Sequence, residues 1–331
     1  MKCMILERVL PVAERPLRAV DKPAPELGPR ELLVKVRACG LCHTDLHIVE
    51  GDIVPLRMPI IPGHQVVGIV AAAVDAHRFR VGDRVGIAWL RQTCGTCEYC
   101  TSGRENLCVH AEFTGLHADG GYAEYAVVHE DFAYHLPEGV SDCEAAPLLC
   151  AGIIGYRALK RSVVRPGEIL GIVGFGASAH ITLQVARHWG CEVFVWSRSP
   201  AHRELACALG AAWCGAPGEQ APALVHGMVY FAPVGHLVPE AMRNLRRGGT
   251  LALAGIHMSP LPEMAYEPHL YYEKTLTSVT ANTRSDGREL LELAAQVPIR
   301  PKTEPYSLES ANEALLALKE GRVNGAAVLV I

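Results

Sequence analysis

Between about residues 168 and 258, short apolar runs alternate with longer amphipathic stretches. The runs Ile169–Val173 and Glu192–Trp196 are bounded by turn-forming residues, which predicts buried strands. After the first run, Ile181, Val185 and Trp189 recur at fourfold spacing before Gly190, as expected for a helix packed on one face. This alternation is typical of β-α-β units on a parallel sheet.

The same pattern continues towards the end of the chain. Ser199 and Pro200 form a good N-cap and first-turn pair for a helix that ends near Gly210. A last helix is predicted over 308–319, ending at Gly321. Further strands are predicted at 228–232, at 250–254 and at 326–331.

The first half of the chain has a different character. Residues 1–150 are rich in Gly and Pro, and they contain short β-branched runs such as 31–37 and 65–70. Short strands with frequent turn residues predict a compact β-rich domain. At 331 residues the chain is long enough for two domains, each with its own core. The sequence therefore predicts an α/β protein that joins a β-rich domain to a doubly wound parallel sheet.

Composition and charge narrow the function classes. Half of the residues are hydrophobic and the formal net charge is −4, which gives no support for binding nucleic acid or an anionic membrane. No apolar run has the length of a membrane span, and Glu7 and Arg8 interrupt the apolar stretch that a signal peptide would need. We therefore expect a cytoplasmic protein, whose 12 cysteines are metal ligands and buried thiols.

A glycine-rich turn lies between the first strand and helix of the second half. Gly174, Gly176 and Ala179 fit the spacing that lets backbone approach a pyrophosphate at a helix N-terminus, which predicts a dinucleotide site. The second strand leads into Ser197 and Arg198, with no carboxylate to bind a ribose 2′-hydroxyl. Because these side chains could bind a 2′-phosphate, the sequence favours NADP(H), with NAD(H) possible.

Four cysteines form the tightest cluster in the chain. Their spacing is Cys-x2-Cys-x2-Cys-x7-Cys, at Cys94, Cys97, Cys100 and Cys108. Four thiolates can surround a tetrahedral Zn²⁺ and leave no open position, which is a structural site. An iron–sulfur cluster uses similar ligands, so spacing alone leaves both open.

Several shorter motifs accompany this cluster. They are Cys42-His-Thr-Asp-Leu-His47, Gly63-His64, Gly82-Asp-Arg-Val85, Asp119-Gly-Gly-Tyr-Ala-Glu-Tyr125 and Cys150-Ala-Gly152. Each alone is unremarkable, because a single Cys or His is usually not a ligand. Together with the four cysteines and the glycine loop, they resemble the zinc-dependent medium-chain alcohol dehydrogenase family nearly end to end.

The resemblance implies two Zn²⁺ ions per chain. The four cysteines would hold a structural zinc rather than an iron–sulfur cluster. A catalytic zinc would be held by Cys42, His64 and Cys150 with an open fourth position, where an alcohol would lose its proton and then give a hydride to the nicotinamide.

The resemblance also assigns roles to neighbouring residues. Thr44 would accept the substrate proton and His47 would pass it to solvent, while Asp45 would orient His64. His43 would approach the cofactor pyrophosphate. Trp89 would form a wall of the substrate pocket, although plain core packing explains it equally well. Gln65 departs from the family, which commonly has Glu beside the zinc-binding His, and should tune the acidity of the metal.

The implied architecture is a GroES-like catalytic domain of residues 1–152 and 285–331, carrying both zincs, and a Rossmann domain of residues 153–284. The implied function is reversible, nicotinamide-dependent oxidation of a small alcohol to an aldehyde, in a homodimer or homotetramer. The alternative is a non-catalytic zinc-binding or redox-responsive protein on the same fold, which would be supported by a missing catalytic ligand.

Overall fold

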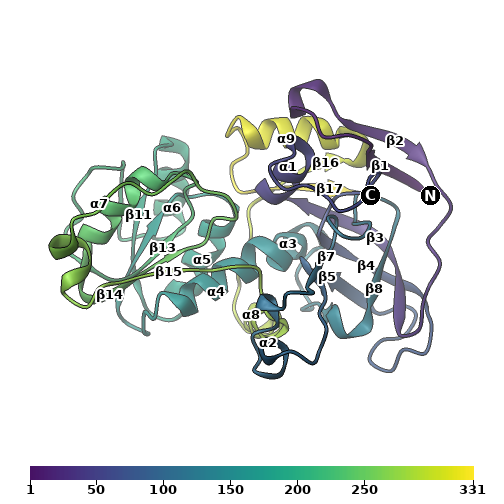
Figure 1. Ribbon diagram of the computed structural model, residues 1–331, viewed down its shortest axis with the longest axis horizontal. Helices are drawn as coiled ribbons and strands as arrows, with labels where there is room; N and C mark the ends of the chain where they lie inside the picture. The colour runs from purple at the N-terminus through teal and green to yellow at the C-terminus, as the bar shows by residue number, and fades with distance from the viewer. The chain divides into compact units, whose positions relative to one another are not determined.

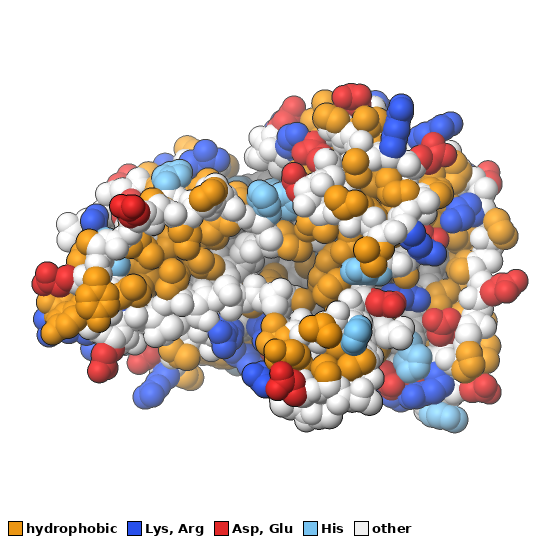
Figure 2. All heavy atoms as spheres, in the orientation of Figure 1, with side chains coloured by type: hydrophobic (Ala, Val, Ile, Leu, Met, Phe, Trp, Pro, Cys, Tyr) orange, Lys and Arg blue, Asp and Glu red, His pale blue; other side chains and the backbone are white.

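The computed structural model describes all residues 1–331 and divides into two compact units (Figure 1). Unit 1 comprises Met1–Cys150 and Ala281–Ile331, and unit 2 comprises Ala151–Thr280. None of the helices has the length and apolar character needed to cross a bilayer. Acidic and basic side chains are interspersed on the face shown in Figure 2, with no extended field of one sign.

Unit 1 is built on a seven-stranded, mostly antiparallel sheet. Its strand order is β16-β17-β3-β4-β5-β9, and β8 also pairs with β3. The bounds are Glu31–Leu41 for β3, Gln65–Ala73 for β4, Arg84–Ile87 for β5, Tyr125–His129 for β8, Ala133–His135 for β9, Thr303–Ser307 for β16 and Ala326–Val330 for β17. Only β16 and β17 run parallel.

Alternation along β3 explains how this sheet covers the core. Leu32, Val34 and Val36 are buried, whereas Lys35 and Arg37 between and after them are exposed. Because successive side chains of a strand point to opposite faces, one face of β3 supplies the core and the other faces outward. The predicted runs at 31–37 and 65–70 are thus strands, each longer than the run that predicted it.

Smaller elements complete unit 1. Two further ribbons pair β1 (Lys2–Leu6) with β2 (Leu17–Asp21) and β6 (Leu90–Gln92) with β7 (Glu112–Phe113). The helices are α1 (His43–Glu50), α2 (Glu98–Thr101), α3 (Asp142–Pro147), α8 (Arg284–Gln296) and α9 (Ala311–Lys319). The predicted helix over 308–319 begins as a 3₁₀ turn at Leu308–Ser310 and continues as α9.

Unit 2 contains a six-stranded, fully parallel sheet in the order β12-β11-β10-β13-β14-β15. The bounds are Ile169–Val173 for β10, Glu192–Trp196 for β11, Trp213–Gly215 for β12, Val225–Tyr230 for β13, Leu245–Leu253 for β14 and Thr275–Ser278 for β15. In chain order this is 3-2-1-4-5-6, the arrangement of dinucleotide-binding Rossmann folds. The predicted parallel sheet is confirmed, with β10 and β11 at the predicted residues.

Helices cover both faces of this sheet. They are α4 (Ile153–Arg161), α5 (Ala177–His188), α6 (Pro200–Ala208) and α7 (Val238–Arg243). Helices α5 and α6 connect β10 to β11 and β11 to β12, towards one edge of the sheet, whereas α7 connects β13 to β14, towards the other edge. Because such crossovers are right-handed, α7 lies on the opposite face of the sheet from α5 and α6. Helix α6 begins as predicted, because the Ser199 side chain accepts a hydrogen bond from His202 N and Pro200 occupies the first turn.

Candidate functional site

Two of the predicted metal ligands lie at neighbouring strand ends in unit 1. Cys42 directly follows β3 and caps α1, and His64 directly precedes β4. The two strands are antiparallel, and Gly40 pairs with Gln65. The end of β3 therefore lies beside the start of β4, and this register brings Cys42 Sγ to 3.4 Å from His64 Nε2.

Cys150 completes the group from a distant part of the chain. It lies in the π-helical segment Leu148–Gly152, and local widening of a helix is frequent at functional sites. Cys150 Sγ is 3.2 Å from His64 Nε2, and the three ligand atoms all lie within 4.8 Å of one another. Tetrahedral Zn²⁺ with ordinary bond lengths separates a sulfur from a nitrogen ligand by about 3.6 Å. The donor set and its spacing therefore fit zinc, and three protein ligands leave one position open.

Buried charge surrounds His64. Its ring and the Asp45 carboxylate are both fully buried, and Nδ1 lies 3.1 Å from Asp45 Oδ1. Although burial opposes a charged ring, the negative charges of Asp45 and Cys42 raise the pKa of His64 to about 10. Burial raises the pKa of Asp45. Because both carboxylate and thiolate attract positive charge, the same surroundings favour a divalent cation, whose binding would displace the proton from Nε2.

Packing fixes the segment that carries His64. Gly63 has a φ of +98°, and a Cβ there would lie 2.4 Å from the Tyr122 ring. Both facts require glycine beside the ligand. The Trp89 ring meets the His64 ring edge to face at 4.8 Å and stacks on Phe113. Trp89 is thus a buried core residue that also contacts a metal ligand.

Gln65 lies next to His64 and is 1% exposed. Its Nε2 has no hydrogen-bond partner within the chain. A buried amide donor without a partner is costly, so this group is not satisfied by the chain itself. Asp45 differs from Gln65 in that both of its oxygens have donors, since Oδ2 also accepts from Cys42 N at 2.9 Å.

Helix α1 carries the residues predicted to handle protons. Thr44 and His47 are three residues apart, so they share a helix face. His47 Nδ1 lies 2.8 Å from Asp52 Oδ2. Thr44 is 7% exposed, the His47 side chain 14% and the Asp52 side chain 46%, so the three groups are progressively more accessible to solvent. His43, at the start of the helix, is exposed.

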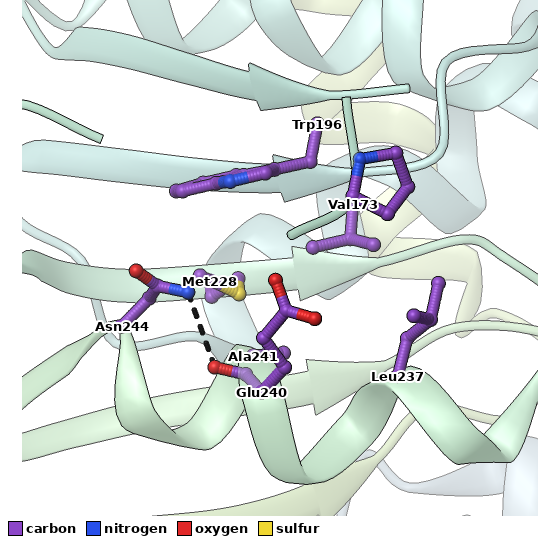
Figure 3. A pocket seen from close by; sticks show the side chains of 8 residues that line it. Val173, Trp196, Met228, Leu237, Glu240, Ala241 and Asn244 are labelled. Carbon is purple, nitrogen blue, oxygen red and sulfur yellow. Dashed lines mark hydrogen bonds between the residues drawn. The ribbon is translucent and has the colours of Figure 1, made fainter. Parts of the chain in front are cut away.

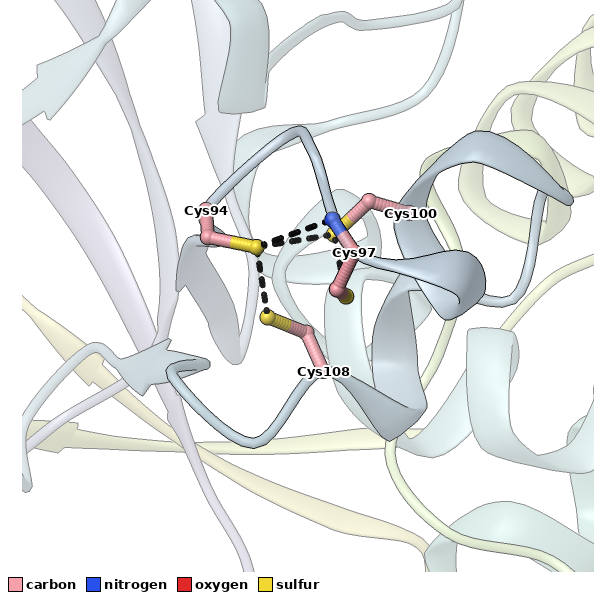
Figure 4. A group of neighbouring side chains, drawn as sticks. All are labelled: Cys94, Cys97, Cys100 and Cys108. Atoms are coloured by element: carbon pink, nitrogen blue, oxygen red, sulfur yellow. Dashed lines mark hydrogen bonds between the residues drawn. The ribbon is translucent and has the colours of Figure 1, made fainter.

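The four cysteines lie together in one lobe of unit 1, residues 94–108 (Figure 4). Cys94 follows β6, Cys97 and Cys100 flank and occupy α2, and Cys108 ends a 3₁₀ turn. The Sγ atoms of Cys94 and Cys100 are 3.9 Å apart, those of Cys97 and Cys100 3.5 Å, and those of Cys94 and Cys108 3.6 Å. These distances fit tetrahedral zinc, for which about 3.8 Å is expected.

Hydrogen bonds favour the thiolate form of one cysteine in this lobe, Cys94. Backbone hydrogen bonds from Thr96 and Cys97 lower the pKa of Cys94 to about 5. The Cys97 N–H lies 3.4 Å from Cys94 Sγ. Since a thiolate is the form that binds a metal, this local geometry supports a metal site.

In unit 2, the glycine loop connects β10 to α5. Gly174 has a φ of +83°, and a Cβ there would lie 2.9 Å from Ala232 N, so the tight turn requires glycine. Gly176 caps α5, and a Cβ there would meet nothing within 4 Å. Open space at a helix N-terminus fits a pyrophosphate, and Ala179 is fully buried where the helix packs on the sheet.

The end of β11 carries the predicted residues for the ribose. The Ser197 N–H donates to Gly215 O on β12, and Arg203 Nη1 donates to the carbonyls of Ser197 and Arg198 at 2.7 and 3.0 Å. Ser197 is buried and Arg198 is exposed. The backbone of this loop is therefore held from two sides, while the Arg198 guanidinium faces solvent.

Unit 2 also contains a small apolar cavity of about 20 Å³ (Figure 3). Strand residues Val173, Trp196 and Met228 line one side, and residues of α7 line the other. This volume suffices for about one water molecule. This volume is too small for a ligand of the size of a dinucleotide.

Sequence reasoning gave Asp52 no role beside His47. Its contact with His47 depends on the turn at Gly51, whose φ is +87°. Gly51 after the helical pattern indicates where the helix ends. It does not show that the side chain of the next residue contacts the helix.

Comparison with known proteins identifies the family. Residues 28–138 match the alcohol dehydrogenase GroES-like domain, and residues 179–296 match the zinc-binding dehydrogenase family. A probable alcohol dehydrogenase, AdhA, from Mycobacterium tuberculosis is 49% identical, covering 100% of this chain and 97% of that protein. An alcohol dehydrogenase from Geobacillus stearothermophilus is 40% identical, covering 95% and 94%.

Solved structures agree. A cinnamyl alcohol dehydrogenase from Sorghum bicolor superimposes with a TM-score of 0.91 at 28% identity, covering 99% of this chain and 97% of that one. An NAD-dependent alcohol dehydrogenase gives 0.91 at 26% identity, with both chains fully covered. With both predicted zinc sites assembled and these relatives matched along its length, the chain belongs to the zinc-dependent medium-chain alcohol dehydrogenase family.

Proposed function

We propose that this alcohol dehydrogenase acts on a small alcohol at the Cys42–His64–Cys150 site, with NADP(H) as the preferred hydride carrier. The observation that carries the proposal is the convergence of two cysteine sulfurs and one imidazole within 4.8 Å of one another. Three protein ligands leave a tetrahedral zinc ion one open position. When bound there, zinc acts as a Lewis acid on the substrate oxygen, and the nicotinamide exchanges the hydride.

The chain's own residues would move the proton. The buried Thr44 hydroxyl, two residues after the metal ligand Cys42, would accept the substrate hydroxyl proton while giving its own proton to His47. His47 would then pass a proton towards solvent by way of the more exposed Asp52 carboxylate, which lies 2.8 Å from its Nδ1. Progressive exposure from Thr44 to Asp52 supports this order. Asp45 would keep His64 in the tautomer that presents Nε2 to the metal.

Unit 2 would bind the cofactor. Gly174, Gly176 and Ala179 would form the pyrophosphate loop, and Ser197 and Arg198 would contact the 2′-phosphate. His43 would approach the pyrophosphate, and Trp89 would border the substrate. These assignments support a catalytic unit of residues 1–152 and 285–331 and a nucleotide-binding unit of 153–284. The family likeness also supports a homo-oligomer.

Steady-state kinetics would test the proposal. The zinc-loaded enzyme is assayed with primary, secondary and aromatic alcohols, each with NADP⁺ and with NAD⁺. We expect alcohol-dependent reduction of the nicotinamide and a higher kcat/KM for NADP⁺, and Arg198→Gln should reduce that preference. Absence of turnover with every alcohol would contradict the catalytic assignment, and an unchanged preference in Arg198→Gln would contradict the assignment of NADP(H).

A further inference from the structure

Two cysteines of unit 2 face each other outside both metal sites. Cys207 lies in the last turn of α6, and Cys214 lies in the middle of β12. Their Sγ atoms are 2.9 Å apart. Neither residue belongs to a group of metal-binding side chains.

The local fold brings this pair together. Helix α6 ends at Ala208, and the chain reverses through Gly210, whose φ is +90°. The Ala211 N–H donates back to Ala206 O, and Cys214 then pairs with Val195 of β11. The two sulfurs are thus held by a helix end, a tight turn and a strand rather than by flexible chain.

The two thiols differ in their surroundings. Cys207 is exposed, and Cys214 is partly buried. Burial of Cys214, followed by its hydrogen bond with Cys207, raises the pKa of Cys214 to about 12. Cys214 therefore keeps its proton, and Cys207 is the sulfur that a dissolved oxidant reaches first. A disulfide has an S–S bond of about 2.05 Å, so the sulfurs need to approach by less than about 1 Å.

We propose that Cys207 and Cys214 form a reversible redox pair that closes to an intramolecular disulfide when a hydroperoxide is present. Cys207 gives its proton to solvent and its sulfur attacks the peroxide, so that an S–O bond forms while the O–O bond breaks; the leaving hydroxide takes up a proton and becomes water. Cys214 sulfur then attacks Cys207 sulfur, so the S–S bond forms and the sulfenic oxygen departs with the Cys214 proton as water. The two thiols lose two electrons and two protons, and hydrogen peroxide is reduced to two molecules of water.

The disulfide would act on the cofactor loop, a consequence that rests on the proposed function. Arg203, one helical turn before Cys207, donates to the carbonyls of Ser197 and Arg198. Gly215, next to Cys214, accepts from Ser197 N. A covalent link between α6 and β12 thus joins the two elements that hold this loop, and it should change the KM for NADP⁺ while leaving the KM for the alcohol unchanged.

Peptide mapping of the zinc-loaded enzyme tests the pair. Cleavage after Arg203 and Arg243 releases one fragment that contains Cys207 and Cys214 and no other cysteine. After limiting hydrogen peroxide and alkylation, this fragment should resist alkylation at both cysteines and lose the mass of two hydrogen atoms. Dithiothreitol should restore both thiols. Cys207→Ser and Cys214→Ser should each prevent the loss, and zinc content measured in parallel should stay constant.

Two outcomes would overturn the inference separately. Alkylation of both cysteines after peroxide, with zinc retained, would refute the redox pair whatever cofactor the enzyme uses. Disulfide formation with an unchanged KM for NADP⁺ would refute the link to the cofactor loop. Cys191→Ser is the matched control, since it removes another unit 2 thiol and should leave both responses as in the unmutated enzyme.

Discussion

Substitution of Asp45 by Asn tests how the chain prepares His64 for the metal. Asp45 accepts two hydrogen bonds, from His64 Nδ1 at 3.1 Å and from Cys42 N at 2.9 Å. Asn has one accepting atom and one donating group, so it satisfies only one of these donors. If the amide nitrogen faces His64, the ring proton moves to Nε2, the atom that must bind zinc.

The expected magnitude follows from this loss. Removing the group that orients a metal-binding His typically lowers metal affinity or activity by about 10–100-fold, which is about 1.4–2.8 kcal/mol. Asp45 is fully buried, so water cannot replace the lost acceptor. We therefore expect Asp45→Asn to release the catalytic zinc to a competing chelator at a correspondingly lower chelator concentration, with the structural zinc retained.

A matched control separates the metal from the helix cap. Asp45 closes a capping box with Cys42 at the start of α1, and Asp286 closes one with Thr283 at the start of α8. Asp286→Asn removes a carboxylate acceptor from the box at α8 while the Thr283 cap remains, so it should lower stability modestly and leave both zincs bound. The reasoning is refuted if Asp45→Asn retains both zincs at the chelator concentration that the unmutated enzyme tolerates and keeps its kcat/KM.

The remaining predictions concern the lobe, the proton route and acid stability. Cys97→Ser should lower the thermal midpoint and promote aggregation, because structural zinc contributes folding energy; an unchanged midpoint in a thermal scan would contradict this. His47→Ala should slow turnover mainly at low pH, where proton release most needs help, and a pH–rate profile depressed equally at every pH would argue against the relay. Burial opposes charge on Glu130, yet hydrogen bonds from the N–H groups of Arg78 and His77 and from Arg30 lower its pKa to about 2. Because the pKa of Glu130 is lower in the folded state, its carboxylate stabilises the fold at pH values above the ordinary carboxyl pKa. That contribution is lost as the pH falls towards 2. Glu130→Gln should therefore lower the thermal denaturation midpoint at pH 7 and make this midpoint fall less steeply below about pH 4.5. An equal fall in mutant and unmutated enzyme would count against Glu130.

Strands buried inside a sheet could be predicted from the sequence, whereas strands at a sheet edge could not. Strands β10 and β11 lie inside a parallel sheet, so their apolar runs are continuous and were located to the residue. Strand β12 has three residues, and β15 is an edge strand reading Thr-Leu-Thr-Ser. Neither strand carries a hydrophobic run. Both form because they pair with a neighbouring strand, and a local sequence pattern does not show that pairing.

The site shows the same limit. The spacing of the four cysteines indicated one metal from local sequence, whereas Cys150 is 86 residues from His64 and entered only through the family resemblance. Its position depends on the π-helical turn after α3. The Cys207–Cys214 contact likewise depends on how α6 returns to the sheet, which spacing does not specify.

Zinc content measured together with turnover tests the central claim most directly. The account predicts two zinc ions per chain in the unmutated enzyme and in the control Cys191→Ser. It predicts one zinc ion, a retained fold and no alcohol-dependent turnover in Cys42→Ser and in Cys150→Ser. Either of these two variants keeping both ions and normal activity would contradict the assignment of Cys42, His64 and Cys150 as the catalytic metal ligands.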